Sequence, residues 1–282
     1  MQSNNPIFTR NDEFNGRGRG AAVQNDPSQW QVDLNGSPAS TYTEPSTGRM
    51  TIDSVVEKTA ITLGLVVVAA IAAWIVIGQA VTDDGFVNDS AVSKAYALTL
   101  VGGLGGFALV MVNAFKKVTS PALVIGYAVL EGLFVGAFSK LITTFVSADS
   151  SIVFGAVLGT FAAVAGTLAA YKFFDIQVGA KFRKIVIASL MGFVAVSLLS
   201  LVMSFFGSGL GVNGFGPVGF VFACLGLVLG VFMLILDFDF VEKGIEAGLP
   251  EVESWQAALG LTVTIVWIYT NILRILAIIN ND

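Results

Sequence analysis

The chain has 282 residues, of which 55% are hydrophobic and only 12% charged, and its mean hydropathy is +0.78. A soluble domain carries about 25% charged residues, so this composition excludes an ordinary soluble protein and indicates a polytopic membrane protein. The net charge of −5 gives no reason to expect nucleic-acid binding. The absence of histidine excludes Ser–His and Cys–His catalysis and histidine zinc motifs, and the single cysteine excludes an internal disulfide.

Residues 1–50 are rich in Asn, Gly, Ser, Pro and Thr and contain few aliphatic side chains. They lack the apolar core of about 7–15 residues that marks a secretory signal peptide. A segment of this composition cannot bury enough apolar surface to offset its ordering entropy. We therefore expect a polar, disordered cytoplasmic tail over residues 1–50, followed by a transmembrane domain over residues 51–282 that opens with an amphipathic lead-in, Thr51 to Lys58.

Apolar stretches follow, each near the roughly 20 residues that a helix needs to cross a bilayer. The charge-free stretch 185–236 is too long for one span, and its glycine-rich middle divides it in two. Glycines four residues apart, such as Gly132 and Gly136 or Gly226 and Gly230, allow helices to approach closely. The sequence predicts an all-α integral membrane protein with seven transmembrane helices, at about residues 59–81, 95–115, 121–141, 151–171, 185–206, 215–236 and 254–279.

Lysine and arginine near the span ends predict the orientation. With the N-terminal tail inside, the opposite side of the membrane holds only Lys94, Lys140 and Arg274. The cytoplasmic side then collects the other basic residues close to the spans: Arg49, Lys58, Lys116, Lys117, Lys172, Lys181, Arg183, Lys184 and Lys243. We expect a cytoplasmic N-terminus and a C-terminus outside.

Glu131 is the only acidic residue deep within a predicted span. An ionised carboxylate that faces lipid at this depth costs about 3 kcal/mol or more. The side chain is therefore expected to face the interior of the bundle. Two interpretations stay open: a proton or cation site, or a neutral hydrogen-bonded glutamic acid that fixes helix packing.

Asp237 and Asp239 follow the sixth predicted span. A spacing of two residues separates them by about 200° around a helix, so one is expected to face inward and the other the interface or water. An inward carboxylate can act as a pH-dependent gate, and its oxygens suit a hard cation such as calcium. As a metal site the pair is a weak signal, because no EF-hand loop surrounds it.

Two polar residues of the last predicted span are further candidates for an ion path. Arg274, near its outer end, either snorkels to the interface or pairs with an inward acid. Asn271 lies close by and can line a polar path.

Four sequence segments carry a family resemblance: residues 50–53 (MTID), 131–139 (EGLFVGAFS), 237–242 (DFDFVE) and 267–274 (WIYTNILR). In their order and spacing they resemble the Bax inhibitor-1 family of membrane proteins, in particular bacterial, actinobacterial-type members with a long polar N-terminal tail. The resemblance implies a seven-helix bundle whose last helix is central and surrounded by the other six. It also implies a pH-sensitive calcium leak, latched by two aspartates, one from each of the last two helices, that share a proton.

The first aspartate of that latch corresponds to Asp237 or Asp239. The second has no counterpart, since Thr264 or Asn271 stands there, depending on the register. Glu131 can supply the missing acid only if the third helix faces the sixth.

The sequence and the resemblance together predict a pH-sensitive cation leak channel or transporter of the bacterial plasma membrane, with calcium as the transported ion. We expect no bound cofactor, a monomer in contact with membrane lipids, and no enzymatic activity, since the Gly-x-Gly-Asp sequence of intramembrane aspartyl proteases is also absent. The alternative is a non-conducting regulator that binds other membrane proteins, such as a quality-control protease.

Overall fold

The computed structural model describes residues 48–81, 86–116, 119–146, 151–174, 176–207 and 209–281. Residues 1–47 of the predicted tail lie outside this part, so its predicted disorder stays a prediction. The last residues of that segment are ordered: Met50 is buried, and its backbone N–H donates to the carbonyl of Leu249 at 2.7 Å.

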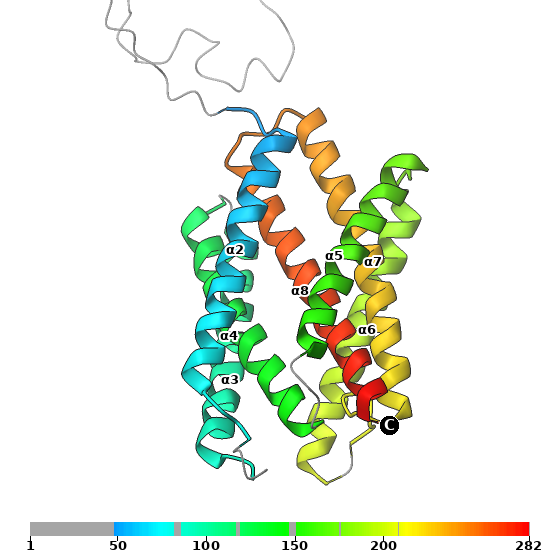
Figure 1. The fold of residues 1–282 in the computed structure, drawn as a ribbon. Coiled ribbons are helices and arrows are strands. Elements are labelled where there is room, and N and C mark those ends of the chain that lie inside the picture. The colour runs from blue at the N-terminus through cyan, green and yellow to red at the C-terminus, as the bar shows by residue number, and fades with distance from the viewer. Residues whose placement is uncertain are drawn as a thin grey trace, which may run out of the picture. The chain divides into compact units, whose positions relative to one another are not determined.

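The described residues form seven α-helices, and each is long and apolar enough to span a membrane. Outside the helices, they contain only two isolated β-bridges and no strand. The predicted all-α, seven-helix membrane fold is thus confirmed (Figure 1). The helices are α2 (Ile52–Ile77), α3 (Asp89–Phe115), α4 (Pro121–Phe145), α5 (Ser151–Phe173), α6 (Ala180–Phe205), α7 (Pro217–Glu246) and α8 (Glu253–Asn281).

Local sequence signals account for several helix starts. Thr51 and Ser54 form a capping box at the start of α2, and the Asn88 side chain accepts from two backbone N–H groups of α3. Pro121 and Pro217 occupy the first turns of α4 and α7, where a missing N–H costs nothing. The expected lead-in to the first span is continuous with α2.

The last helix, α8, lies in the middle of the bundle, as the family resemblance implies (Figure 1). It packs against α2, α4, α5 and α7, while α3 packs mainly on α4 and α6 on α7. Close approach between α2 and α4 depends on Gly132 and Gly136, because a Cβ at either position would collide with the backbone of α2 at Val66 or Ala70.

The helix α7 continues to Glu246, ten residues past the end of the predicted sixth span. Asp237 and Asp239 therefore lie within a regular helix and are held by its neighbours, rather than at a helix end. This continuation decides which groups the two carboxylates meet.

Candidate functional site

Asp237 lies on the side of α7 that faces the central helix α8. Its Oδ2 accepts a hydrogen bond of 2.5 Å from the hydroxyl of Thr264. Its Oδ1 lies beside Gly260, one turn earlier on α8, where a Cβ would be 3.5 Å away. Within the described residues no basic side chain forms an ion pair with Asp237. The α7–α8 interface therefore holds a carboxylate whose direct partner is a neutral hydroxyl.

Asp239 is held differently, although it is only two residues away. It is buried, its Oδ2 accepts from Nη2 of Arg183 at 2.9 Å, and its Oδ1 lies 2.6 Å from Nζ of Lys243. Arg183 belongs to α6, so this cluster fastens α6 to α7. The two aspartates thus point to different partners, and in the described part of the chain no three acidic, Cys or His residues come together as they would around a metal ion.

Asn271 lies two turns beyond Thr264 on the same helix. Its Nδ2 donates to the carbonyl of Trp267 at 2.8 Å, and its Oδ1 fills the space beside Gly226 of α7. The indole N–H of Trp267 donates to the Gly226 carbonyl at 2.8 Å. This part of the α7–α8 interface is closely packed. Asn271 lies about two helical turns along α8 from Thr264, the residue that contacts Asp237.

Glu131 points from α4 toward α3. Its Oε2 lies 3.1 Å from the position that a Cβ would take on Gly106, and the Tyr127 ring lies against the same glycine. The helix packs against α2, α3 and α8 rather than against α7. The structure therefore does not bring Glu131 to Asp237, and the condition under which it could supply a second acid is not met.

Arg274 is half-buried near the end of α8. Its Nη2 donates to the carbonyls of Val212 and Gly214 at 2.8 and 3.3 Å. Both belong to the segment between α6 and α7, so the guanidinium ties this segment to α8. Of the two expectations for Arg274, pairing with an acid is not seen among the described residues.

Polar contacts between α2 and α8 were not expected from the sequence, where threonines within spans carried little weight. The signal that could have found them is a shared eight-residue spacing of hydroxyl residues on the two helices. Three side-chain contacts join α2 to α8 or to the residues just before it: Ser54 to Ser254 at 2.7 Å, Lys58 to Glu251 at 2.8 Å, and Thr62 to Thr262 at 2.9 Å.

Thr262 and Thr264 together hold α8 from two sides at one level. Thr262 contacts Thr62 of α2, and Thr264 contacts Asp237 of α7. Both threonines are buried. The central helix is therefore clamped between α2 and α7 by hydroxyl and carboxylate groups, and this arrangement is the candidate functional site.

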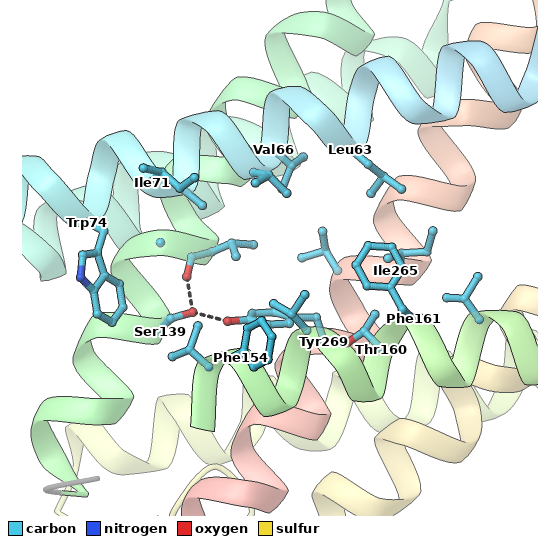
Figure 2. A pocket seen from close by; sticks show the side chains of 18 residues that line it. Leu63, Val66, Ile71, Trp74, Ser139, Phe154, Thr160, Phe161, Ile265 and Tyr269 are labelled. Atoms are coloured by element: carbon cyan, nitrogen blue, oxygen red, sulfur yellow. Dashed lines mark hydrogen bonds between the residues drawn. The ribbon is translucent and has the colours of Figure 1, made fainter. Parts of the chain in front are cut away.

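A separate cavity of about 500 Å³ lies between α2, α4, α5 and α8 (Figure 2). Its lining is apolar except for Ser139, Thr160, Tyr269 and the indole N–H of Trp74. Ser139 and Tyr269 share a hydrogen bond of 2.7 Å, and Ser139 also donates to the Val135 carbonyl at 2.6 Å (Figure 2). None of the predicted site residues lines this cavity, and no sequence pattern predicted it.

A family model described as Bax inhibitor 1 like matches residues 5–281. The chain belongs to this family. The resemblance seen in four segments of the sequence is thereby confirmed. Among curated proteins no match to the chain was found.

Because the chain belongs to the Bax inhibitor 1 like family, the register of α7 against α8 shows which residue lies opposite the α7 acid of the expected aspartate pair. The sequence left Thr264 and Asn271 as alternatives for the position opposite the α7 acid. The structure places Thr264 there, because its hydroxyl contacts Asp237, whereas Asn271 packs against Gly226. This member of the family has one carboxylate and one hydroxyl where a shared-proton pair is expected.

Proposed function

We propose that this protein is a cation leak channel or transporter of the bacterial plasma membrane, with calcium as its ion and Asp237 as its pH-responsive gate. The observation that carries the proposal is the Asp237–Thr264 contact on the central helix, without a basic partner in the described part of the chain. Placing an acidic side chain within a membrane span is unfavourable in free energy, and such residues mark ion or proton pathways. Carboxylate oxygens are also the ligands that calcium prefers.

The proposed gate is the level of α8 at which Thr262 contacts Thr62 of α2 and Thr264 contacts Asp237 of α7; we call these two contacts the clamp. An ion that passes along α8 has to separate the helix from α2 or α7, and at this level that breaks the Thr62–Thr262 or the Asp237–Thr264 contact. A proton on Asp237 removes its charge at this contact, so the stability of the clamped state depends on pH. One carboxylate acts here instead of a pair.

Asp239 has a different role in this proposal. Because Arg183 and Lys243 occupy both of its oxygens, it holds α6 against α7 and does not bind the ion. Glu131 and Asn271 are assigned to the walls of the bundle, and Arg274 to the anchoring of the segment before α7. All these groups belong to one chain, so a monomer suffices, and the mechanism needs no cofactor and no catalytic step.

The orientation is part of the proposal. We place the N-terminus in the cytoplasm and the C-terminus outside, because basic residues near the helix ends cluster on the side of the N-terminus. The clamp then lies in the cytoplasmic half of the bundle, since Thr62 is only ten residues into α2.

The test is calcium flux into liposomes that contain the full-length protein and a calcium dye, at mildly acidic and at mildly alkaline pH. We expect flux above that of empty liposomes, with a rate that differs between the two conditions. Asp237→Asn should abolish this difference, whereas Asp53→Asn, which removes an exposed carboxylate at the start of α2, should not.

Absence of calcium flux at both pH values would contradict the channel proposal. The non-conducting regulator would then be the better hypothesis, and its test is the capture of membrane proteins by the full chain and by a chain without residues 1–50. A flux whose pH dependence survives Asp237→Asn would keep the channel but remove the proposed gate.

A further inference from the structure

The cavity beside α8 opens sideways, between α2 and α5. These two helices are not among the pairs that pack together, and α4 and α8 form the floor between them. Side chains along both rims are more than half exposed: Val67 and Ile71 on α2, and Phe154 and Phe161 on α5. Figure 2 shows α2 and α5 on opposite sides of this space, which we call the lateral crevice.

The interior of the lateral crevice offers little to a polar ligand. The hydroxyls of Ser139 and Tyr269 bond to each other, and that of Thr160 donates to the Ala156 carbonyl at 2.7 Å. A trapped water needs two to four polar partners, which these satisfied groups do not supply. The lining of this part of the crevice therefore suits hydrocarbon rather than water, and in a bilayer the available hydrocarbon is a lipid acyl chain.

The length of the crevice fits one acyl chain. Along α2 its lining runs from Leu63 to Trp74, and eleven residues at a rise of 1.5 Å span about 16 Å. This length matches one leaflet of a hydrocarbon core about 30 Å thick. The crevice thus extends from near the middle of the bundle toward the end at which α2 finishes.

A tryptophan and a lysine stand at that end. Nζ of Lys140 lies 4.3 Å from the ring centroid of Trp74, which itself lines the crevice. Tryptophan is enriched at the level of the lipid headgroups, and a lysine near a helix end extends its ammonium group to the same level. The positive charge of Lys140 there can bind an anionic headgroup. Within the described residues no carboxylate pairs with Lys140.

We propose that the lateral crevice binds one acyl chain of an anionic phospholipid whose headgroup is held by Lys140. The headgroup lies beside Trp74, in the leaflet at the far end of α2, and the chain runs down the crevice to Leu63. The bound chain covers Ile265, Val266 and Tyr269 of α8, so the lipid contacts the central helix directly. This site is independent of Asp237 and of the proposed ion flux.

The test is photo-crosslinking of the full-length protein in phosphatidylcholine vesicles. These contain traces of a phospholipid with a diazirine in one acyl chain and either a phosphatidylglycerol or a phosphatidylcholine headgroup. Labelled positions are mapped by mass spectrometry. We expect the phosphatidylglycerol probe to label residues 63–74 and 153–164 several-fold more than the equally exposed surface of α6, and several-fold more than the phosphatidylcholine probe does.

Two matched pairs of variants separate the headgroup from the chain. Lys140→Gln should remove the preference for phosphatidylglycerol, whereas Lys94→Gln, an exposed lysine near the start of α3, should leave it unchanged. Val157→Trp should lower labelling of the crevice, whereas Leu158→Trp, its exposed neighbour outside the lining, should not.

Labelling spread evenly over all lipid-facing helices would overturn the proposal in favour of ordinary surrounding lipid. A preference for phosphatidylglycerol that survives Lys140→Gln would overturn the assignment of the headgroup. If Val157→Trp does not fold, as size-exclusion chromatography would reveal, the lysine pair still decides the question, because neither lysine is part of the packed core.

Discussion

The central helix α8 presents two contrasting faces. Toward α2 and α7 its threonines form direct hydrogen bonds to Thr62 and Asp237, and the helices are closely joined. Toward α5 it presents Ile265 and Tyr269 to the lateral crevice, where side chains leave a space of about 500 Å³. In a membrane a polar group needs a partner within the protein, whereas an apolar surface can be covered by lipid. The polar face is therefore closed by protein, and the apolar one can stay open.

The largest expected effect comes from the contact between α2 and α4, which forms one wall of the lateral crevice. Gly136→Ala puts a Cβ against the backbone of α2 at Ala70, so α2 and α4 must move apart. We expect a loss of about 3 kcal/mol or more in the free energy of unfolding, at the upper end of overpacking costs, measured by thermal unfolding in detergent. The control is Gly166→Ala on α5, where a Cβ meets nothing within 4 Å. Equal effects of the two changes would contradict the close packing of α2 and α4.

The next largest loss in the free energy of unfolding is expected for Asp239, and it separates the role of this residue from that of Asp237. Asp239→Ala leaves Arg183 and Lys243 without their carboxylate, and both are about half exposed. Because water can then solvate the two cations, we expect a loss of about 1 to 2 kcal/mol. Asp237→Asn should cost less, since an amide oxygen still accepts from Thr264.

Chemical unfolding of both variants in the same detergent measures this difference. Protease accessibility of α6 provides a second readout, and it should rise only in Asp239→Ala, because Arg183 is on α6. A larger loss for Asp237→Asn than for Asp239→Ala would reverse the assigned roles.

A smaller effect tests the contact between α2 and α8. Thr62 and Thr262 are both fully buried, and each hydroxyl also lies within hydrogen-bond distance of a carbonyl of its own helix. Because a hydroxyl has one proton, one threonine donates to its own helix while the other donates across the α2–α8 interface. In a double-mutant cycle of Thr62→Val and Thr262→Val, we expect a coupling energy of about 0.6 kcal/mol, which is typical of hydrogen bonds between membrane helices. Calcium flux should rise in the double variant, because the clamp is weakened. A coupling energy of zero would mean that this contact does not hold the helices together.

An effect on stability of similar size is expected at the apolar face. Lys140→Gln removes the cation above the Trp74 ring, and such contacts contribute about 0.5 to 1 kcal/mol at exposed sites. We expect a small loss that is larger in vesicles with phosphatidylglycerol than in phosphatidylcholine alone, because only the former supplies the proposed ligand. Thermal unfolding in the two kinds of vesicle measures this difference, and an identical loss in both would count against a lysine-held lipid.

The sequence by itself determined the seven helices and the family. Runs of about 20 apolar residues have few alternatives to a spanning helix, since the bilayer leaves no other way to satisfy their backbone groups. It also indicated that Asp237 and Asp239 face different ways, because this follows from helix geometry alone.

Only the tertiary structure decided which groups meet. The choice of Thr264 over Asn271 opposite Asp237 depends on how far α7 and α8 slide past each other, and the position of Glu131 beside Gly106 depends on the packing of α4 against α3. The lateral crevice exists because α2 and α5 do not pack against each other. Sliding, rotation and separation of apolar helices are set by many small packing contacts between helices, and a single helix's sequence does not contain them.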